Sequence, residues 1–156
     1  EPLSKEILEK FRHNLLLIHT GISRNAQSAV EEVYKNFKTK KGKKAIKTIT
    51  ECGKDFYELI KKSDFVACAK IMEKNFEAQK SLAPSSSNKH LDDMYTTAKK
   101  NGAYGGKICG AGGGGAFIFY CEDTLFLKRV LKNQFVDCFE IDFDFEYQNI
   151  KELNRI

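Results

Sequence analysis

The sequence lacks several features that define whole classes of protein. No apolar run approaches the about 20 residues that a membrane-spanning helix needs. The chain begins at Glu1 without a Met or a charged-then-apolar leader, so we expect no signal peptide and a numbering that begins inside a longer protein. No two of the five cysteines form a CxxC pair, and their odd number argues against a disulfide framework. We therefore expect buried, reduced thiols in a cytoplasmic protein.

The composition that is present is that of a globular domain. The 156 residues suit a single domain over 1–156, and 42% of them are apolar and 30% charged. The net charge of +5 suits a partner rich in phosphate, but this charge alone does not separate a nucleotide from a nucleic acid.

Apolar residues at helical spacing predict a series of helices. These helices are expected around residues 3–11, 26–37, 46–60, 65–76, 91–98 and 125–131. Ser63 or Asp64 is placed to cap one of them, and Asn88 is placed to cap the next. The lysine-rich segment 38–44 separates two of them and should be an exposed turn, because like charges so close together repel one another.

Other segments have the pattern of strands. Residues 15–18 form a short apolar run, 107–109 are short and extended, and 116–121 are strongly β-prone. Residues 139–146 alternate apolar with acidic side chains, which describes a strand with one packed face and one exposed acidic face. The sequence therefore predicts an α+β fold in which helices cover one side of a small, mostly antiparallel sheet.

Glycine is concentrated in one place, because eight of the eleven glycines lie from Gly102 to Gly115. Such a run lets the backbone adopt positive φ and form an anion-binding concavity, or lets another backbone approach closely. The segment satisfies GxGxxG, but a β-prone stretch follows it where a dinucleotide fingerprint needs a helix, and it lacks the Lys-Ser/Thr of a Walker loop. A glycine loop between two strands near a nucleotide remains, with a ligand-free hairpin as the alternative.

Residues 106–115 resemble the third sequence motif of the galacto-/homoserine/mevalonate/phosphomevalonate (GHMP) kinase superfamily, which lies in its C-terminal domain. Residues 16–26 look like the strand-then-helix entry of the D-glycero-D-manno-heptose 7-phosphate kinase branch. Residues 75–82 are similar to a helix end of the same branch. The three segments follow the order of the family, so the resemblance covers nearly the whole chain.

The resemblance implies a ferredoxin-like domain that forms the C-terminal half of a two-domain, ATP-dependent kinase of carbohydrate metabolism. The N-terminal catalytic domain, which in the family binds most of the ATP and the Mg²⁺, is absent, so the fragment alone should be inactive and should hold no catalytic or metal-binding residue. The expected partners are that N-terminal domain, ATP and a sugar phosphate, with no nucleic acid and no membrane. The expected acceptor is a heptose 7-phosphate at its anomeric hydroxyl. The alternatives are a galactokinase- or fucokinase-like enzyme or, in a different class, a basic module that binds nucleic acid or protein.

The resemblance also implies which residues contact the nucleotide. They are those of the glycine loop, with Gly112 and Gly113 expected nearest to it. The full set is Gly110, Ala111, Gly112, Gly113, Gly114 and Gly115. Lys107 lies beside the loop in the sequence, and it could face a phosphate or point outward from its strand.

Four further residues are candidates for the phosphate of the substrate. Thr20, Gly21 and Arg24 lie where a strand ends and a helix opens, and a helix N-terminus with a guanidinium suits a sugar phosphate. The alternative is that these residues form an ordinary helix cap and that Arg24 is solvated. Lys80 could also contact that phosphate, or it could be a solvated lysine at a helix end.

Overall fold

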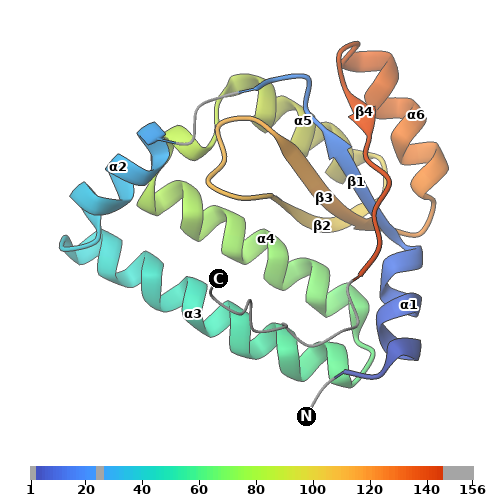
Figure 1. Cartoon of the computed structure of the whole chain (residues 1–156), viewed down its shortest axis with the longest axis horizontal. Coiled ribbons are helices and arrows are strands. Elements are labelled where there is room, and N and C mark those ends of the chain that lie inside the picture. Colours follow the sequence, from blue (N-terminus) through green and yellow to red (C-terminus); the bar gives the residue numbers. More distant parts are fainter. Residues whose placement is uncertain (1–2, 24–26, 146–156) are drawn as a thin grey trace, which may run out of the picture.

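The computed structural model describes residues 3–23 and 27–145 of the chain (Figure 1). The helices are α1 (Lys5–His13), α2 (Gln27–Asn36), α3 (Lys40–Lys61), α4 (Phe65–Leu82), α5 (Lys89–Lys100) and α6 (Thr124–Gln134), with a short 3₁₀ helix η1 (Pro84–Ser86) between α4 and α5. The strands are β1 (Leu15–His19), β2 (Ala103–Ile108), β3 (Ala116–Cys121) and β4 (Phe139–Glu140).

The strands form one sheet in the order β2-β3-β1-β4, and every neighbouring pair is antiparallel. In the register of β1 with β3, Leu15 lies opposite Tyr120 and His19 lies opposite Ala116. The predicted α+β class with a small antiparallel sheet is confirmed.

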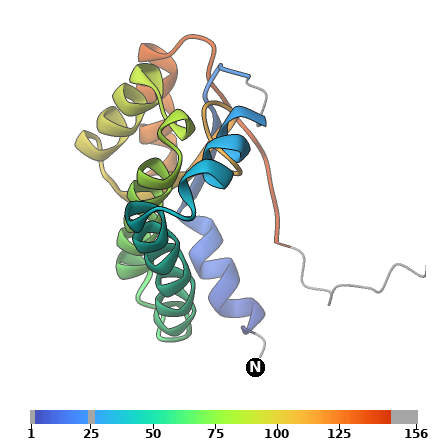
Figure 2. The same ribbon diagram turned by 90° about the vertical axis from the view of Figure 1, so that its left-hand side faces the viewer.

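One face of the sheet carries the main core. Leu16 and Ile18 of β1 and Phe117 and Phe119 of β3 are fully buried on this face. Helices α5 and α6 lie together on this side of the sheet and cover it (Figure 2). Their buried side chains are Leu91, Met94, Tyr95 and Ala98 of α5 and Leu127 and Leu131 of α6. This packing fixes the hairpin of β2 and β3 relative to the start of α5.

The opposite face of the sheet is also packed, which differs from the predicted coverage of one side only. Tyr120 of β3 stacks on Phe11 of α1 with 5.2 Å between ring centroids. Ile60 of α3 and Met72 of α4 are buried in the same cluster. Helix α4 can approach closely because a Cβ at Gly105 of β2 would collide with the backbone of α4. The apolar stripes of α1, α3 and α4 need a surface to cover them, and the second face of the sheet supplies it.

Two helix caps lie where the sequence predicts them. The Asp64 side chain accepts from the N–H of Ala67 at the start of α4, whereas Ser63 has a positive φ of 57° before the cap. The Asn88 side chain accepts from the N–H of Leu91 at the start of α5. Both caps satisfy backbone donors that a helix start would otherwise leave unpaired.

The lysine-rich segment is helical from Lys40 onward, so the prediction of a turn over 38–44 is wrong for most of that segment. The Thr39 hydroxyl accepts from the N–H of Gly42 at 2.9 Å and caps α3. Gly42 is buried against the backbone of Asn36, where a side chain would collide with the carbonyl. The cap and this close approach outweigh repulsion between lysines, because exposed charges are well screened by water.

The predicted strand over 139–146 is mostly not a strand. Of residues 139–145, which the structure describes, only Phe139 and Glu140 pair with β1, and the N–H of Ile141 donates once more to the edge of the sheet. Phe143 and Phe145 pack on the apolar cluster that covers the second face of the sheet, here called the second-face cluster, which includes Phe11, Ile60, Met72 and Tyr120. From 141 to 145 the alternation in the sequence therefore appears as half-buried apolar positions and exposed acidic positions. Glu146 lies outside the described residues.

Within the described residues no helix is long and apolar enough to cross a membrane. All five cysteines lie in this part of the chain and carry free thiols. Four are buried as expected, and Cys109 is exposed. Cys109 directly precedes the glycine loop, which explains its exposure.

Candidate functional site

The glycine loop connects β2 to β3 and reaches past the end of the sheet toward η1 (Figure 1). The N–H of Cys109 donates to the carbonyl of Ala116 at 2.8 Å and closes the base of the hairpin. Within the loop, φ is positive at Gly110, Gly112, Gly113 and Gly115 but not at Ala111 and Gly114. Changes in the sign of φ along a loop can turn successive N–H groups toward a common point and form a concavity for an anion.

Backbone hydrogen bonds hold the second half of the loop against two other segments. The N–H of Gly113 donates to the carbonyl of Ser86 in η1 at 2.7 Å, and the N–H of Gly115 donates to Ile22 at 2.8 Å. The carbonyl of Gly115 in turn accepts from the N–H of Thr20. These bonds use two of the loop's donors inside the protein.

The absence of side chains is required at two positions of this half. A Cβ at Gly112 would collide with the carbonyl oxygen of Ser86, and a Cβ at Gly114 would lie 2.7 Å from the carbonyl oxygen of Ile22. The middle of the loop therefore uses glycine to let backbone approach backbone. These close approaches and the hydrogen bonds above hold the second half of the loop against the rest of the domain.

The first half of the loop is different. The N–H groups of Gly110 and Ala111 have no hydrogen-bond acceptor among the described residues. Gly110 is exposed, and a Cβ there would meet nothing within 4 Å. A single side chain steadies this end, because Gln79 of α4 donates its Nε2 to the carbonyl of Gly110 at 2.9 Å. The N–H groups of Gly112 and Gly114 also lack an acceptor in the described part of the chain, but Gly110 is the most exposed of these positions, so this end of the loop is the more open to an anion.

The N-terminus of α5 lies directly beside the loop. Asn88 caps this helix and also donates its Nδ2 to the carbonyl of Gly113 at 3.3 Å. A helix N-terminus carries partial positive charge, so it adds to the free N–H groups in favouring an anion. The structure thus assembles the glycine loop and the start of α5 into one candidate site for phosphate.

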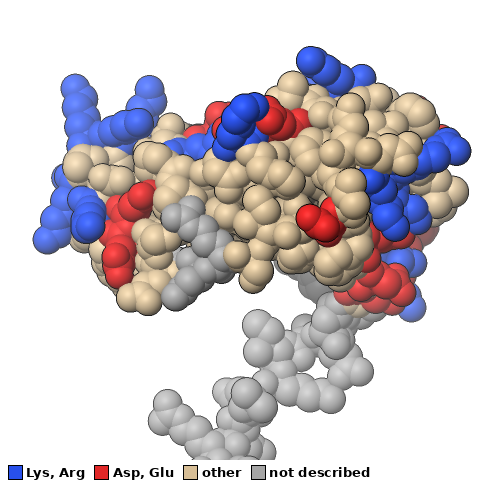
Figure 3. Space-filling view, turned by 90° about the horizontal axis from the view of Figure 1, so that it is seen from above, with Lys and Arg blue, Asp and Glu red and all other residues tan. Residues whose placement is uncertain are grey.

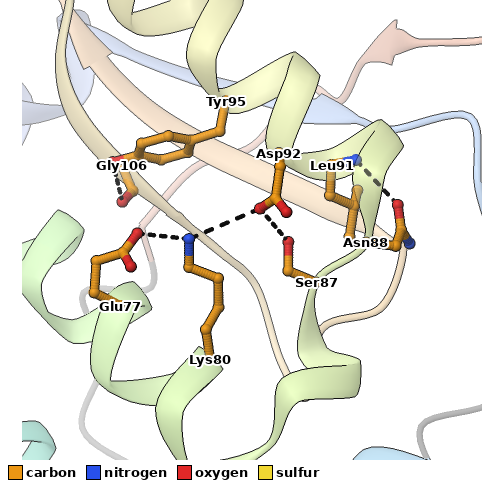
Figure 4. A network of polar contacts seen from close by, with 8 residues as sticks. All are labelled: Glu77, Lys80, Ser87, Asn88, Leu91, Asp92, Tyr95 and Gly106. Carbon is orange, nitrogen blue, oxygen red and sulfur yellow. Dashed lines mark hydrogen bonds and ion pairs between the residues drawn. The ribbon is translucent and has the colours of Figure 1, made fainter.

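Lys80 is held in a network of charges at the end of α4 (Figure 4). Its Nζ lies 2.6 Å from a carboxylate oxygen of Glu77 and 3.7 Å from one of Asp92. The Ser87 hydroxyl donates to the same Asp92 carboxylate at 2.8 Å. The amine therefore faces the start of α5, and a substrate phosphate would have to compete with two carboxylates for it.

Tyr95 closes the inner side of the same region. Its hydroxyl donates to the carbonyl of Gly106 in β2 at 3.3 Å (Figure 4). Burial raises the pKa of Tyr95 well above its ordinary value, so the phenol stays neutral. Tyr95 joins α5 to the strand that leads into the loop.

Ile108 of β2 is buried under α5 and α6 on the main-core face of the sheet. Its neighbour Lys107 points to the other face. Its Nζ donates to the side-chain oxygen of Asn75 in α4 at 2.8 Å. Both residues line an apolar pocket of about 410 Å³ between α1, α3 and the sheet. The described position of Lys107 supports packing of α4, and its predicted contact with a phosphate stays a prediction.

The predicted substrate residues at the end of β1 have structural contacts. Thr20 is fully buried, and its hydroxyl accepts from the N–H of Ile22 within its own turn at 3.3 Å. Gly21 has a φ of 77°, and a Cβ there would lie 2.8 Å from that of Asp137. Arg24 lies outside the described residues. Binding of substrate by these residues stays a prediction.

Sequence reasoning missed the residues that hold the loop. Ser86 is fully buried beside Gly112, and its hydroxyl has no partner within the described residues. Gln79 and Asn88 each donate a side-chain amide to the loop. The sequence identified Asn88 as a cap, but no pattern along the chain gives its second contact, which joins residues 25 positions apart. No group of three His, Cys, Asp or Glu side chains that could hold a metal occurs in the part of the chain that the structure describes.

The fold and the glycine loop together define a class of protein. Residues 56–135 match the family described as GHMP kinases C terminal. This match covers half of the chain, so the chain belongs to the GHMP kinase family as a C-terminal domain.

Among curated proteins, the chain is similar to the D-glycero-alpha-D-manno-heptose 7-phosphate kinase of Campylobacter jejuni subsp. jejuni serotype O:2, with 28% identity over 148 residues. That match covers 93% of the chain and 43% of the relative, so the chain spans less than half the length of this kinase.

Two mevalonate kinases share the fold. The L. major enzyme, solved in complex with R-mevalonate, has a TM-score of 0.71 at 20% identity. The enzyme from methicillin-resistant Staphylococcus aureus MRSA252 has a TM-score of 0.58 at 21% identity. Each match covers 81% of the chain and 40% of the solved structure.

Proposed function

We propose that this domain is the C-terminal half of an ATP-dependent kinase that phosphorylates a sugar or sugar phosphate, specifically a heptose 7-phosphate. The observation that carries the proposal is the glycine loop, which is anchored at Gly113 and Gly115 but keeps free N–H groups at Gly110 and Ala111. Membership of the GHMP kinase family supports the reaction class, and the relative from Campylobacter supports the acceptor.

Phosphoryl transfer depends on positioning the reactants and on neutralising charge at the phosphate oxygens. ATP would supply the phosphoryl group. The N–H groups of Gly110 and Ala111 would donate to phosphate oxygens, and the N-terminus of α5 would favour their negative charge. Gly112 and Gly113 would keep the loop in place through Ser86. The fit lies in the open backbone at Gly110, where no side chain blocks a phosphate.

The remainder of the kinase would lie outside this chain. We infer that residues 1–156 form one domain and that an N-terminal catalytic domain holds most of the ATP and the Mg²⁺. On this proposal the domain alone is inactive, and its partners are that N-terminal domain, ATP and a sugar phosphate. The length of the relatives, more than twice what the chain spans, supports this division.

Acceptor specificity rests on the relative from Campylobacter alone, since the mevalonate kinases share only the fold. A galactokinase- or fucokinase-like acceptor is the alternative within the family. Lys80 is the described residue best placed to meet the acceptor phosphate, because its amine faces the start of α5. Binding there would exchange a carboxylate of Glu77 or Asp92 for the phosphate.

The full-length protein tests the proposal in an assay of ATP consumption. The acceptors are D-glycero-D-manno-heptose 7-phosphate, galactose, fucose and mevalonate, each with Mg²⁺-ATP. We expect turnover with the heptose 7-phosphate and little with the others. Preference for galactose or fucose would reject the acceptor but keep the sugar kinase, and turnover with none of the four would reject the proposed function.

A further inference from the structure

The junction of α2 and α3 carries an unbalanced positive charge. From residue 33 to residue 50 the chain contains seven lysines and no Asp or Glu. Lys and Arg side chains gather at the end of the molecule where these two helices meet, at the left of Figure 3. Several of these lysines lie at the very start of α3.

This placement is unfavourable for the isolated helix. Lys40, Lys41, Lys43 and Lys44 lie in the first turns of α3, where the helix dipole is positive, and no acidic residue is present in the first turn. Cations are disfavoured at a helix N-terminus, and like charges close together repel. The Thr39 cap and the close approach at Gly42 stabilise the start of the helix, but neither neutralises the charge of these lysines. An anion bound at this end would compensate both effects.

A hollow of about 540 Å³ lies between the start of α3 and α4, and three lysines line it, two of them from this region. Lys41 and Lys44 line it from α3, and Lys74 lines it from α4. Thr48 and Ser81 add a hydroxyl from each side. Lys41, Lys44 and Thr48 are three and four residues apart, so they share one face of the helix.

The charges in this hollow are left without partners. Among the described residues, none of the amines of Lys41, Lys44 and Lys74 forms an ion pair or a side-chain hydrogen bond. Glu77 is the acidic residue of the lining, and its carboxylate is paired with Lys80 at 2.6 Å. The hollow is therefore net positive, and it offers hydroxyl donors as well as ammonium groups.

We propose that this hollow is a second anion-binding site, which takes a ligand carrying two or more phosphate groups. Three ammonium groups suit such a ligand better than a single carboxylate, and a volume of this size accommodates a small molecule. None of the residues from Gly110 to Gly115 lines the hollow, so the site is separate from the glycine loop. The proposal stands whether or not the acceptor of the kinase is a heptose. The ligand is either inorganic polyphosphate or an organic bisphosphate, which share this chemistry.

The test uses the full-length protein and two probes, inorganic tripolyphosphate and glucose 1,6-bisphosphate. Binding is measured by isothermal titration calorimetry for the wild type and for two triple variants. Lys41→Gln/Lys44→Gln/Lys74→Gln removes the three charges of the hollow. Lys40→Gln/Lys43→Gln/Lys70→Gln is the matched control, because it removes three exposed lysines from the same two helices without changing the lining.

We expect the hollow variant to weaken binding of at least one probe about tenfold or more, and the control variant to weaken it less than about threefold. Whichever probe loses affinity identifies the source of the phosphate groups. Equal losses in the two variants would show a diffuse surface charge and overturn the proposal, as would an absence of binding to both probes at low salt.

Amide hydrogen exchange of the wild type gives a second measurement that needs no variant. Either probe should slow exchange in the peptides that contain Thr48 and Ser81. Protection confined to other segments, with exchange at these two residues unchanged, would also overturn the proposal.

Discussion

The N–H of Gly113 donates to the carbonyl oxygen of Ser86 at 2.7 Å, which joins the glycine loop to the turn before α5. Gly112 lies over the same carbonyl with no room for a side chain. The position of the loop is thus set by η1 and α5, and not only by the two strands that it connects.

This contact predicts unequal effects of alanine at two neighbouring glycines. Gly110→Ala and Gly112→Ala both place a side chain at positive φ, which costs about 1–2 kcal/mol. Gly112→Ala adds a collision with the backbone of Ser86, so we expect it to lose roughly 1–3 kcal/mol more. Urea denaturation measures both free energies of unfolding. Equal losses would mean that the contact with Ser86 does not constrain the loop.

Asn88 has two separable roles, and two variants divide them. Asn88→Ala removes the cap on Leu91 and the bond to Gly113, so we expect it to lose about 1–2 kcal/mol of stability. Asn88→Asp keeps an acceptor for the cap but has no donor for the Gly113 carbonyl. It should retain most of the stability while amide exchange in residues 109–115 becomes faster. Exchange that stays slow in Asn88→Asp would remove this bond from the account of the loop.

Two buried cysteines predict a loss of stability in alkaline solution. Burial raises the pKa of the Cys121 thiol from 9.0 to about 12 and that of the Cys68 thiol from 9.0 to about 11. Above pH 9 the unfolded chain loses protons that the folded chain keeps, so the free energy of unfolding falls as the pH rises from 9 toward these values. Below pH 9 the two thiols have no effect on the pH dependence.

The matched control for this prediction is the variant Cys68→Ala/Cys121→Ala. Thermal unfolding at pH 8, 9 and 10 should show a shallower fall for the variant than for the wild type. Identical slopes would mean that lysine and tyrosine titration alone causes the alkaline loss.

The charge network at Lys80 makes a prediction about substrate affinity in the full-length enzyme. Lys80→Met should raise the KM for the sugar phosphate about tenfold or more, because it removes an ammonium group facing the start of α5. Lys89→Met is the control, since Lys89 lies on the same helix start but is 87% exposed and paired with Asp93. Steady-state kinetics separate the effects on KM and kcat. A KM that is unchanged in Lys80→Met would leave Lys80 as a residue that joins α4 to α5.

The sequence predicted the helices, β1, β3 and the glycine loop because each depends on local pattern, but of β2 it predicted only the end, at Lys107 and Ile108. The caps at Asp64 and Asn88 and the bounds of β3 are set by neighbours a few residues apart. The strand predicted over 139–146 was mostly wrong, because alternating apolar and acidic residues indicate burial on one side and do not require a partner strand. In the structure that burial comes from packing on the second-face cluster.

The contacts that hold the loop could not be predicted from sequence. Ser86 and Ile22 meet the loop through backbone carbonyls, which every residue has, and Gln79 meets it through a side-chain amide from a position far away in the chain. The family resemblance marked the glycines of the loop as one motif. It did not distinguish the anchored half, at Gly112–115, from the open half at Gly110 and Ala111.

The most direct test of the central claim is amide hydrogen exchange of residues 109–115 in the full-length protein, with and without a non-hydrolysable ATP analogue and Mg²⁺. Calorimetry on the same sample establishes that the analogue is bound. The account predicts that bound nucleotide slows exchange at Gly110 and Ala111, whose N–H groups have no acceptor within the described chain. Exchange there that stays fast while the nucleotide is bound would contradict it.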